Sequence, residues 1–189
     1  MKLEAATDEE LVRRMRTGDE FAFTALYERR HDAVYRFALH MSGSPDAADE
    51  VTQETFMLLI RSANAFDPAR GALVQFLYGV ARNFVRRHIR DEHALSSISE
   101  EFEDELPESL ITRRDPLADL SRRETVERVN QAVLTLPPAY REVVVMCDLQ
   151  ELRYEQAAEI LGCAVGTVRS RLHRGRNLLM SKLQTRCGV

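Results

Sequence analysis

Apolar side chains recur at steps of three and four residues along most of this 189-residue chain, whereas no segment alternates with the two-residue period of a half-buried strand. The longest helical run covers residues 19–41 and places these side chains on one side: Phe23, Leu26, Tyr27, Val34, Phe37, Ala38 and Met41. Gly43 ends that run, and Ser44-Pro45 then supplies an N-cap and a first helical residue. The pattern therefore predicts an all-α fold.

A polar segment rich in Ser, Glu, Asp and Pro separates two blocks of predicted helix. Such a composition buries too little apolar surface to fold by itself and is typical of a mobile linker. We therefore predict two helical domains, at 1–90 and 120–189, joined by an acidic flexible linker at 91–119. The expected helices after residue 43 lie at about 45–65, 73–90, 116–136, 139–149, 154–161 and 165–183.

The net charge of −4 conceals blocks of opposite sign. Residues 91–120 contain ten acidic residues and two arginines. Residues 160–189 contain six basic residues and no acidic one, and residues 76–90 contain four arginines and no acidic residue. Because charge blocks decide which partners a protein attracts, the two basic segments are candidates for contact with nucleic acid.

The chain lacks the features of export and of membrane insertion. Its longest apolar runs, such as 143–147, fall far short of the roughly 18 residues that a membrane span needs. The N-terminal residues 1–8 contain no apolar signal core. Cys147, Cys163 and Cys187 form no C-x-x-C pair, so neither a disulfide framework nor a zinc knuckle is expected. These features indicate a cytoplasmic protein without membrane contact of its own.

Residues 154–172 have the spacing of a helix-turn-helix, with a short helix, a turn at Gly162 and a longer second helix. One side of the second helix is an apolar seam of Val168, Leu172, Gly175 and Leu179. The other side carries donors for phosphates and base edges, namely Ser170, His173, Arg174 and Asn177, flanked by Thr167 and Arg169. A face that is merely solvated has similar residues. The helix-turn-helix spacing and the absence of acidic residues favour a DNA-binding face instead.

Neither helix of this motif begins with a residue that caps well. The N-cap positions hold Arg153 and Ala164 where Ser, Thr, Asp or Asn is preferred. The sequence therefore predicts a motif that a better cap would stabilise.

The expected helix at 73–90 has an inward and an outward stripe. The inward stripe consists of Leu77, Val80, Ala81, Phe84 and His88. The outward stripe consists of Gly79, Arg82, Asn83, Arg86 and Arg90, which suits a nucleic-acid backbone. Nearby Phe66, Phe76 and Tyr78 are candidates for stacking on unpaired bases, although aromatic residues at helical spacing are more often core.

The helix after Pro45 carries an acidic and polar face of Asp46, Asp49, Glu50, Gln53 and Met57. Such a face is either simply solvated or a docking surface for a basic protein. The sequence alone leaves both readings open.

Taken together, these motifs resemble a known family. The runs Asp46–Phe56, Phe66-Asp67-Pro68 and Phe76–Asn83 are similar to region 2 of the extracytoplasmic-function sigma factors. The runs Leu136–Val143 and Val165–Leu172 are similar to region 4 of the same family. The resemblance covers about residues 8–90 and 120–183. The chain departs from the family at Phe76, where many members have Trp, and at the two N-cap positions without Ser, and Val74-Gln75 gives no clue to the preferred base.

The resemblance implies a bacterial transcription initiation factor rather than an enzyme. Such a factor recruits core RNA polymerase to promoters, helps to open the DNA and is controlled by an anti-sigma factor. Its implied partners are the β′ clamp and the β flap of the polymerase and promoter DNA, with no metal and no cofactor.

The resemblance also implies roles for individual residues. The face of the helix after Pro45 would bind the polymerase through Asp46, Asp49, Glu50, Gln53 and Met57. The melted −10 strand would be held by Phe66, Arg82, Asn83, Arg86 and Arg90. The −35 duplex would be bound by Thr167, Arg169, Ser170, His173 and Arg174.

Two other functions are compatible with parts of the sequence. A free-standing helix-turn-helix regulator would account for residues 154–172 but not for the acidic face or the Asn83 stripe. An all-α metal-dependent phosphohydrolase is suggested by the dipeptide His31-Asp32. That site needs further ligands, and the remaining histidines show no helpful spacing.

Overall fold

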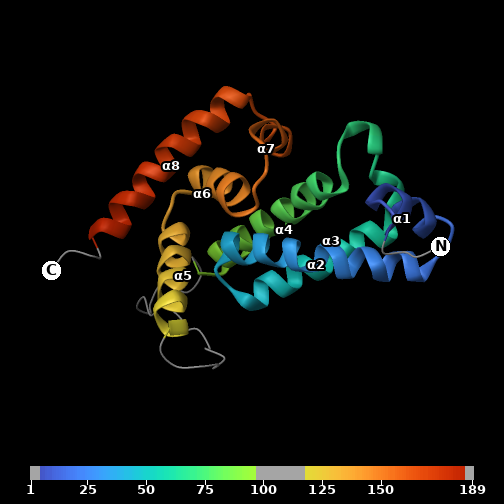
Figure 1. Cartoon of the computed structure of the whole chain (residues 1–189), viewed down its shortest axis with the longest axis horizontal. Helices are drawn as coiled ribbons and strands as arrows, with labels where there is room; N and C mark the ends of the chain where they lie inside the picture. The colour runs from blue at the N-terminus through green and yellow to red at the C-terminus, as the bar shows by residue number, and fades with distance from the viewer. Residues whose placement is uncertain (1–4, 97–117, 186–189) are drawn as a thin grey trace.

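The computed structural model describes residues 5–96 and 118–185, and within these ranges the regular structure is helical, without strands (Figure 1). Residues 5–96, here the first module, contain α1 (Asp8–Met15), α2 (Glu20–Ser42), α3 (Pro45–Arg61), the 3₁₀ turns η2 (Ala63–Ala65) and η3 (Pro68–Arg70), and α4 (Leu73–Ser96). Residues 118–185, the second module, contain α5 (Ala118–Leu134), α6 (Pro138–Val144), the π-helical turn η4 (Val145–Leu149), α7 (Tyr154–Leu161) and α8 (Val165–Thr185). The predicted all-α fold is confirmed.

Several predicted helix boundaries need correction. The helix predicted to reach residue 65 ends at Arg61, because Ser62 leaves the helical conformation. The helix predicted at 139–149 is a short α-helix followed by the π-helical turn. Helix α4 continues beyond the predicted boundary at residue 90 to Ser96. Most of the predicted linker, residues 97–117, lies outside the described residues.

Polar side chains cap the helices of the first module. The Oγ1 of Thr7 and the Oγ of Ser44 each accept a hydrogen bond from a backbone N–H in the first turn of the following helix, both at 3.2 Å. Asp19 caps α2 in the same way, and its hydrogen bond from Arg14 holds the pKa of its carboxyl below the usual value. The Ser44 cap and the stop at Gly43, both predicted from the sequence, are confirmed.

The core of the first module lies among α2, α3 and α4. Leu26, Phe37, Leu59 and Leu77 are fully buried there, as the helical periodicity predicts. In the second module, Val168 and Leu172 of α8 are buried against α6 and α7, so the predicted apolar seam is confirmed.

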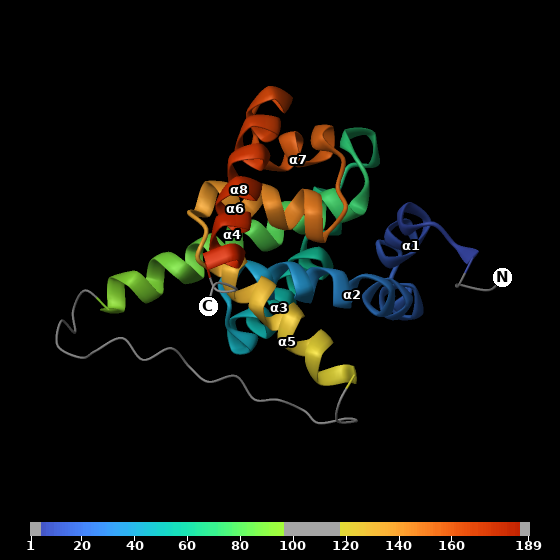
Figure 2. The same cartoon turned by 60° about the vertical axis from the view of Figure 1, so that its left-hand side comes forward.

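The two modules also pack directly against each other, an arrangement that the sequence did not predict. Helix α4 contacts α2 and α3 of its own module and α7 of the second module, and α2 contacts α5 and η4 (Figures 1 and 2). Buried side chains of both modules form one continuous apolar cluster. Helices α1 and α8 lie toward opposite ends of the long axis of the molecule (Figure 1).

The junction of α2, α5 and α6 is held by one guanidinium. Arg141 donates to the carbonyl oxygen of Met41 at 2.8 Å, to that of Leu136 at 3.2 Å and to that of Leu134. Because it binds carbonyls at the C-terminal ends of α2 and α5, its positive charge is well placed against both helix dipoles. Burial lowers the pKa of Arg141, and its Nε is buried without a hydrogen-bond partner.

Gly43 is required at this junction for two reasons. Its φ of +79° is left-handed, and a Cβ built on it would lie 2.9 Å from Cδ1 of Leu134 in the other module. Gly162 in the second module also has a left-handed φ, of +63°, but its Cβ would meet nothing within 4 Å.

These glycines give a matched pair of variants. We expect Gly162→Ala to cost about 1 to 2 kcal/mol from backbone strain alone. Gly43→Ala should cost more, since it must also displace Leu134, and the excess should disappear when Leu134 is replaced by Ala. Thermal and urea unfolding followed by circular dichroism measure these costs; equal losses for the two single variants would show that the modules do not touch at Leu134.

Helix α8 starts at Val165, which leaves Ala164 at the N-cap position, as predicted. We expect Ala164→Ser to stabilise the chain by about 0.5 to 2 kcal/mol, because the serine hydroxyl can accept from an unpaired N–H of the first turn. An increased melting temperature in differential scanning calorimetry is the predicted result, and an unchanged one would contradict this helix boundary.

Arg16, just after α1, fastens the loop between α3 and α4. Its guanidinium donates to the carbonyl oxygen of Ala63 at 2.9 Å and to that of Phe66 at 2.5 Å. A neighbouring arginine, Arg13, pairs instead with Glu10 on its own helix.

We expect Arg16→Ala to loosen residues 62–71 without unfolding the module, because the loop loses hydrogen bonds to a charged donor. Hydrogen exchange read by mass spectrometry should become faster in peptides that cover this loop. Arg13→Ala is the control and should leave exchange there unchanged; equal effects of the two variants would contradict a specific role for Arg16.

Candidate functional site

The residues predicted to bind the polymerase form one exposed surface on α3. This α3 surface consists of Asp46, Asp49, Glu50, Gln53 and Met57, and all five are exposed. Beside it, burial and then the carboxylates of Asp49 and Asp46 raise the pKa of Tyr35. Burial is the larger cause of this shift, and the two carboxylates add to it.

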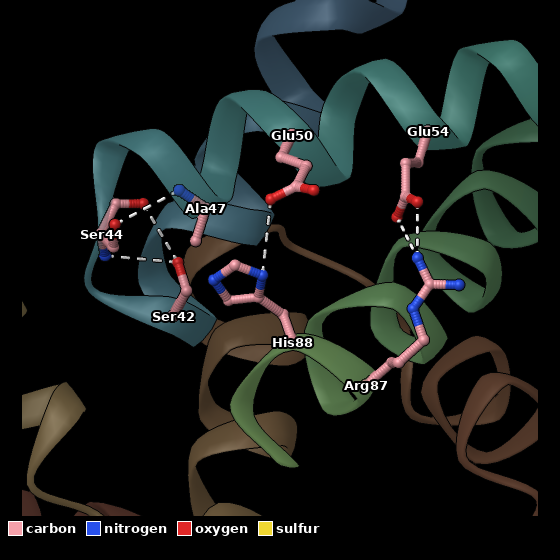
Figure 3. A network of polar contacts seen from close by, with 7 residues as sticks. All are labelled: Ser42, Ser44, Ala47, Glu50, Glu54, Arg87 and His88. Atoms are coloured by element: carbon pink, nitrogen blue, oxygen red, sulfur yellow. Dashed lines mark hydrogen bonds and ion pairs between the residues drawn. The ribbon is translucent and has the colours of Figure 1, made fainter. Parts of the chain in front are cut away.

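Two residues of α4 border the α3 surface (Figure 3). Arg87 donates to both carboxylate oxygens of Glu54, at 2.5 and 2.7 Å, and His88 lies 3.6 Å from a carboxylate oxygen of Glu50. A hollow beside Arg87 is lined by apolar side chains from Met57, Leu58 and Phe84 and by polar ones that include Glu50, Gln53 and Glu54. The surface thus combines acidic residues with a few apolar ones, a composition that suits a basic helix with apolar residues.

The structure separates the residues predicted to hold the −10 strand into exposed and covered ones. Asn83, Arg86 and Arg90 are exposed on α4. Phe66 is 2% exposed and packs on Phe76, with ring centroids 5.8 Å apart. Phe66 is therefore a core residue in this arrangement and cannot stack on a base unless the loop around it moves.

Arg82 is the second covered residue. Its Nε donates to Oε1 of Glu142 at 2.8 Å and its Nη2 donates to Oε2 at 3.2 Å. The two side chains are 14% and 8% exposed. The prediction that Arg82 faces outward is therefore wrong for this arrangement, because α6 of the second module covers it.

Sequence reasoning missed Glu142 as the partner of Arg82. The available signal was its position directly before the apolar run Val143–Met146, since a carboxylate buried in such a context needs a cation. That signal does not identify which arginine, 60 positions away, supplies the charge.

Further contacts join the modules near Arg82. The hydroxyl of Tyr78 donates to Oε1 of Gln150 at 2.9 Å, and burial raises the pKa of this tyrosine. A hollow between the modules is lined by Phe66 and Asn83 from the first and by Glu159 and Ile160 from α7. The predicted −10 residues and the predicted −35 module therefore share one boundary.

The helix-turn-helix is formed by α7 and α8, with Gly162 in the turn. Arg169, Ser170, His173 and Arg174 are exposed on α8, and Thr167 is half-buried. The guanidinium of Arg169 lies 5.8 Å from the ring centroid of Tyr154, and Ser170 donates to the carbonyl oxygen of Thr167 at 3.0 Å. The predicted −35 residues thus share one outer face of a helix long enough to enter a major groove.

One cap in this motif was missed by sequence reasoning. The side-chain oxygen of Gln156 accepts from the backbone N–H of Arg153 at 2.9 Å, which satisfies one donor at the start of α7. The glutamine at the third helical position was the signal for it.

His31 and Asp32, the residues that suggested a metal-dependent phosphohydrolase, have partners close to them in the sequence. His31 lies 3.1 Å from the Asp32 carboxylate, and its ring lies between Tyr27 and Tyr35. No group of three or more His, Cys, Asp or Glu side chains is placed to hold a metal within the described ranges. Burial raises the pKa of the Cys147 thiol to about 11, while Cys187 lies outside the described residues. A search of the same ranges finds no helix that could span a membrane.

Two family models match the chain, one in each module. The model described as Sigma-70 region 2 matches residues 26–94, and that described as Sigma-70, region 4 matches residues 127–179. They occur in the order expected from the motifs.

Curated relatives extend the match over nearly the whole chain. The ECF RNA polymerase sigma-E factor of Salmonella typhimurium is 32% identical, over 96% of this chain and 96% of its own. The ECF RNA polymerase sigma factor SigW of Bacillus subtilis is 27% identical, over 92% of this chain and 95% of its own. The ECF RNA polymerase sigma factor SigE of Mycolicibacterium smegmatis is 37% identical, and the match covers 88% of this chain but 65% of that protein.

Solved structures have the same fold. The sigma factor RpoE of Bartonella quintana, in complex with the anti-sigma factor NepR, is 25% identical with a TM-score of 0.71, covering 86% of this chain and 96% of that one. CnrH, in complex with the cytosolic domain of CnrY, is 24% identical with a TM-score of 0.71, covering 95% and 99%. Because both regions match in order and relatives at this identity align almost end to end, the chain belongs to the extracytoplasmic-function (ECF) family of RNA polymerase sigma factors.

Proposed function

We propose that this protein recruits core RNA polymerase to specific promoters and helps to open the DNA, acting by binding alone and breaking no covalent bond. The observation that carries the proposal is the pairing, in one chain of this family, of an acidic exposed α3 surface with a basic exposed face on α8. The first suits a basic protein and the second suits DNA.

The α3 surface is the proposed docking site for the β′ clamp of the polymerase. Its carboxylates would attract a basic partner and set the orientation of docking, while Met57 and its apolar surroundings would provide the desolvated centre of the contact. The β flap would be contacted by the second module.

Helix α8 is the proposed reader of the −35 duplex. In a helix-turn-helix the second helix lies in the major groove and its N-terminal residues reach base edges. Arg169, Ser170, His173 and Arg174 occupy that part of α8. Arginine offers the fork that binds guanine or phosphate, so Arg174 and Arg169 would supply most of the affinity.

The exposed part of α4 is the proposed site for the melted −10 strand. Arg86 and Arg90 would contact phosphates, and Asn83 would lie near an extruded base. Extruding a base costs a few kcal/mol, and each stacked base returns about 1 to 3 kcal/mol. Capture of unpaired bases can therefore favour the open DNA.

The tether between the modules would let both engage one promoter, so that binding of either module raises the effective concentration of the other. We further propose a cytoplasmic location and control by an anti-sigma factor. Support for that partner comes from the similar sigma factor of Bartonella quintana, which was solved with one.

Run-off transcription with purified core polymerase on a genomic promoter library tests this function. The polymerase should initiate at a new set of promoters when the chain is added. Tight binding of the chain to duplex promoters without polymerase, combined with no change in start sites, would instead identify a free-standing regulator.

Two substitutions separate the proposed steps. We expect Arg174→Ala to weaken discrimination at one −35 position by about 1 to 3 kcal/mol, because a forked contact to a base pair is lost. Asn83→Ala should reduce permanganate reactivity of the melted strand more than it reduces polymerase recruitment in mobility-shift assays. Lys182→Ala, on α8 but outside the −35 group, is the control and should do neither; equal effects of all three would contradict these assignments.

A further inference from the structure

The arginines of α8 differ in what occupies their guanidinium groups. Arg176 donates to both carboxylate oxygens of Asp148 in η4, at 3.0 and 2.5 Å, so its charge is matched within the second module. Arg169 is exposed, and within the described residues none of its N–H groups donates to a protein acceptor. Arg169 therefore keeps its donors for a ligand, although it lies about two turns before Arg176 on the same side of α8.

Arg169 is nevertheless held in place, because it lies over an aromatic ring. Its guanidinium carbon is 5.8 Å from the ring centroid of Tyr154, the first residue of α7. A guanidinium over an aromatic ring is attracted by the electrons of the ring and needs none of its N–H donors for this contact. The ring thus restricts the position of Arg169 without using its hydrogen bonds.

Tyr154 is itself anchored within the second module. The hydrogen bonds with Asp148 raise the pKa of Arg176 most, and a side-chain hydrogen bond with Tyr154 raises it further. Tyr154 is also half-buried and packs against the apolar cluster. The chain of contacts therefore runs from Asp148 in η4 through Arg176 and Tyr154 to Arg169.

The place of this contact in the motif indicates which part of a DNA duplex Arg169 can reach. Arg169 lies about 100° around α8 from the buried Val168, whereas Ser170 and Asn177 lie about 180 to 200° from it. In a helix-turn-helix the second helix lies in the major groove and the first helix crosses the DNA backbone. Because Arg169 is held against α7, the first helix, it lies at the flank of α8 that would be next to a row of phosphates.

We propose that Arg169 binds a backbone phosphate of duplex DNA and that Tyr154 is the residue that positions it there. Arg174, for which the described residues provide no such support, remains the candidate for a base contact. The inference rests on the proposed DNA-binding role of α8, and it divides the −35 group into a phosphate anchor and base-reading residues.

The test uses the full-length chain without polymerase and a short fluorescent DNA duplex of randomised sequence, because a phosphate contact needs no particular base. Arg169→Gln should weaken binding about tenfold at about 50 mM salt and lower the slope of log K against log salt by about 0.9, since one phosphate contact is lost. Lys182→Gln removes the same charge near the far end of α8 and is the control. It should change the affinity and the slope much less.

A double-mutant cycle tests the role of Tyr154. Tyr154→Leu should weaken binding by about two- to tenfold, because Arg169 then loses its freedom of movement only when it binds DNA. The same substitution should have no further effect in the Arg169→Gln chain, whereas it should weaken the Arg174→Gln chain as much as it weakens the unmodified one. Tyr154→Phe keeps the ring and should bind within about twofold of the unmodified chain.

Several results would overturn the proposal. They are an unmodified chain that does not bind the duplex at this salt, an unchanged salt slope in Arg169→Gln, and a loss in Tyr154→Leu that persists without Arg169. Sequencing of the bound duplexes adds a further check. Arg169→Gln should prefer the same sequences as the unmodified chain, and an altered preference at one base pair would identify a base contact instead. Because Arg169 is exposed, its substitution tests the phosphate contact even if Tyr154→Leu fails to fold.

Run-off transcription separates this inference from the proposed function. If the unmodified chain directs no initiation but the salt slope and the cycle give the expected values, the proposed function fails and the contact of Arg169 stands. If the chain directs initiation but Arg169→Gln leaves the salt slope unchanged, the phosphate contact alone fails.

Discussion

The forked pair between Arg82 and Glu142 links the two halves of this sigma factor, within a boundary that also contains a continuous apolar cluster. The pair is almost completely buried. Arg141, the residue directly before Glu142 on α6, donates to the carbonyl oxygen of Met41 in the first module. Two adjacent residues of α6 thus fasten it to the first module, one through a carboxylate and the other through a guanidinium. Hydrogen bonds to charged groups contribute more than neutral ones, so these two residues dominate the polar part of the boundary.

The surfaces with proposed functions lie at different distances from this boundary. The two modules can therefore be packed together while some of these surfaces stay accessible to partners. The α3 surface and the −35 face of α8 are exposed in the closed arrangement, whereas Arg82 and Phe66 are covered. The proposed polymerase docking and duplex reading would therefore require no prior rearrangement. Capture of the melted strand is the proposed step that would gain from opening, because it uses residues that the closed arrangement covers.

Local sequence information predicted the helices and the exposed surfaces well, because caps, glycine stops and the 3.6-residue period act over a few positions. Ser44, Gly43 and the seam of Val168 and Leu172 are examples. It failed where a distant segment decides the outcome. The outward stripe of α4 was predicted correctly from the helical period, but Arg82 within it is buried by its contact with Glu142. The helical period contains no information on such a distant partner. The end of α3 was likewise misplaced, because Ser62 leaves the helical conformation, and the carbonyls of Ala63 and Phe66 that follow it accept from the distant Arg16.

We expect the modules to be packed together in the free chain and apart on a promoter. The most direct measurement is the distance between spin labels at two exposed positions outside the predicted binding faces, Glu28 on α2 and Gln184 on α8, in a chain whose cysteines are replaced by alanine. Electron–electron double resonance should give one narrow distance distribution for the free chain, because the modules are packed together. It should lengthen by tens of Å, toward the spacing of the promoter elements, when core polymerase and promoter DNA are added. The same distance in the free and promoter-bound states would contradict the account.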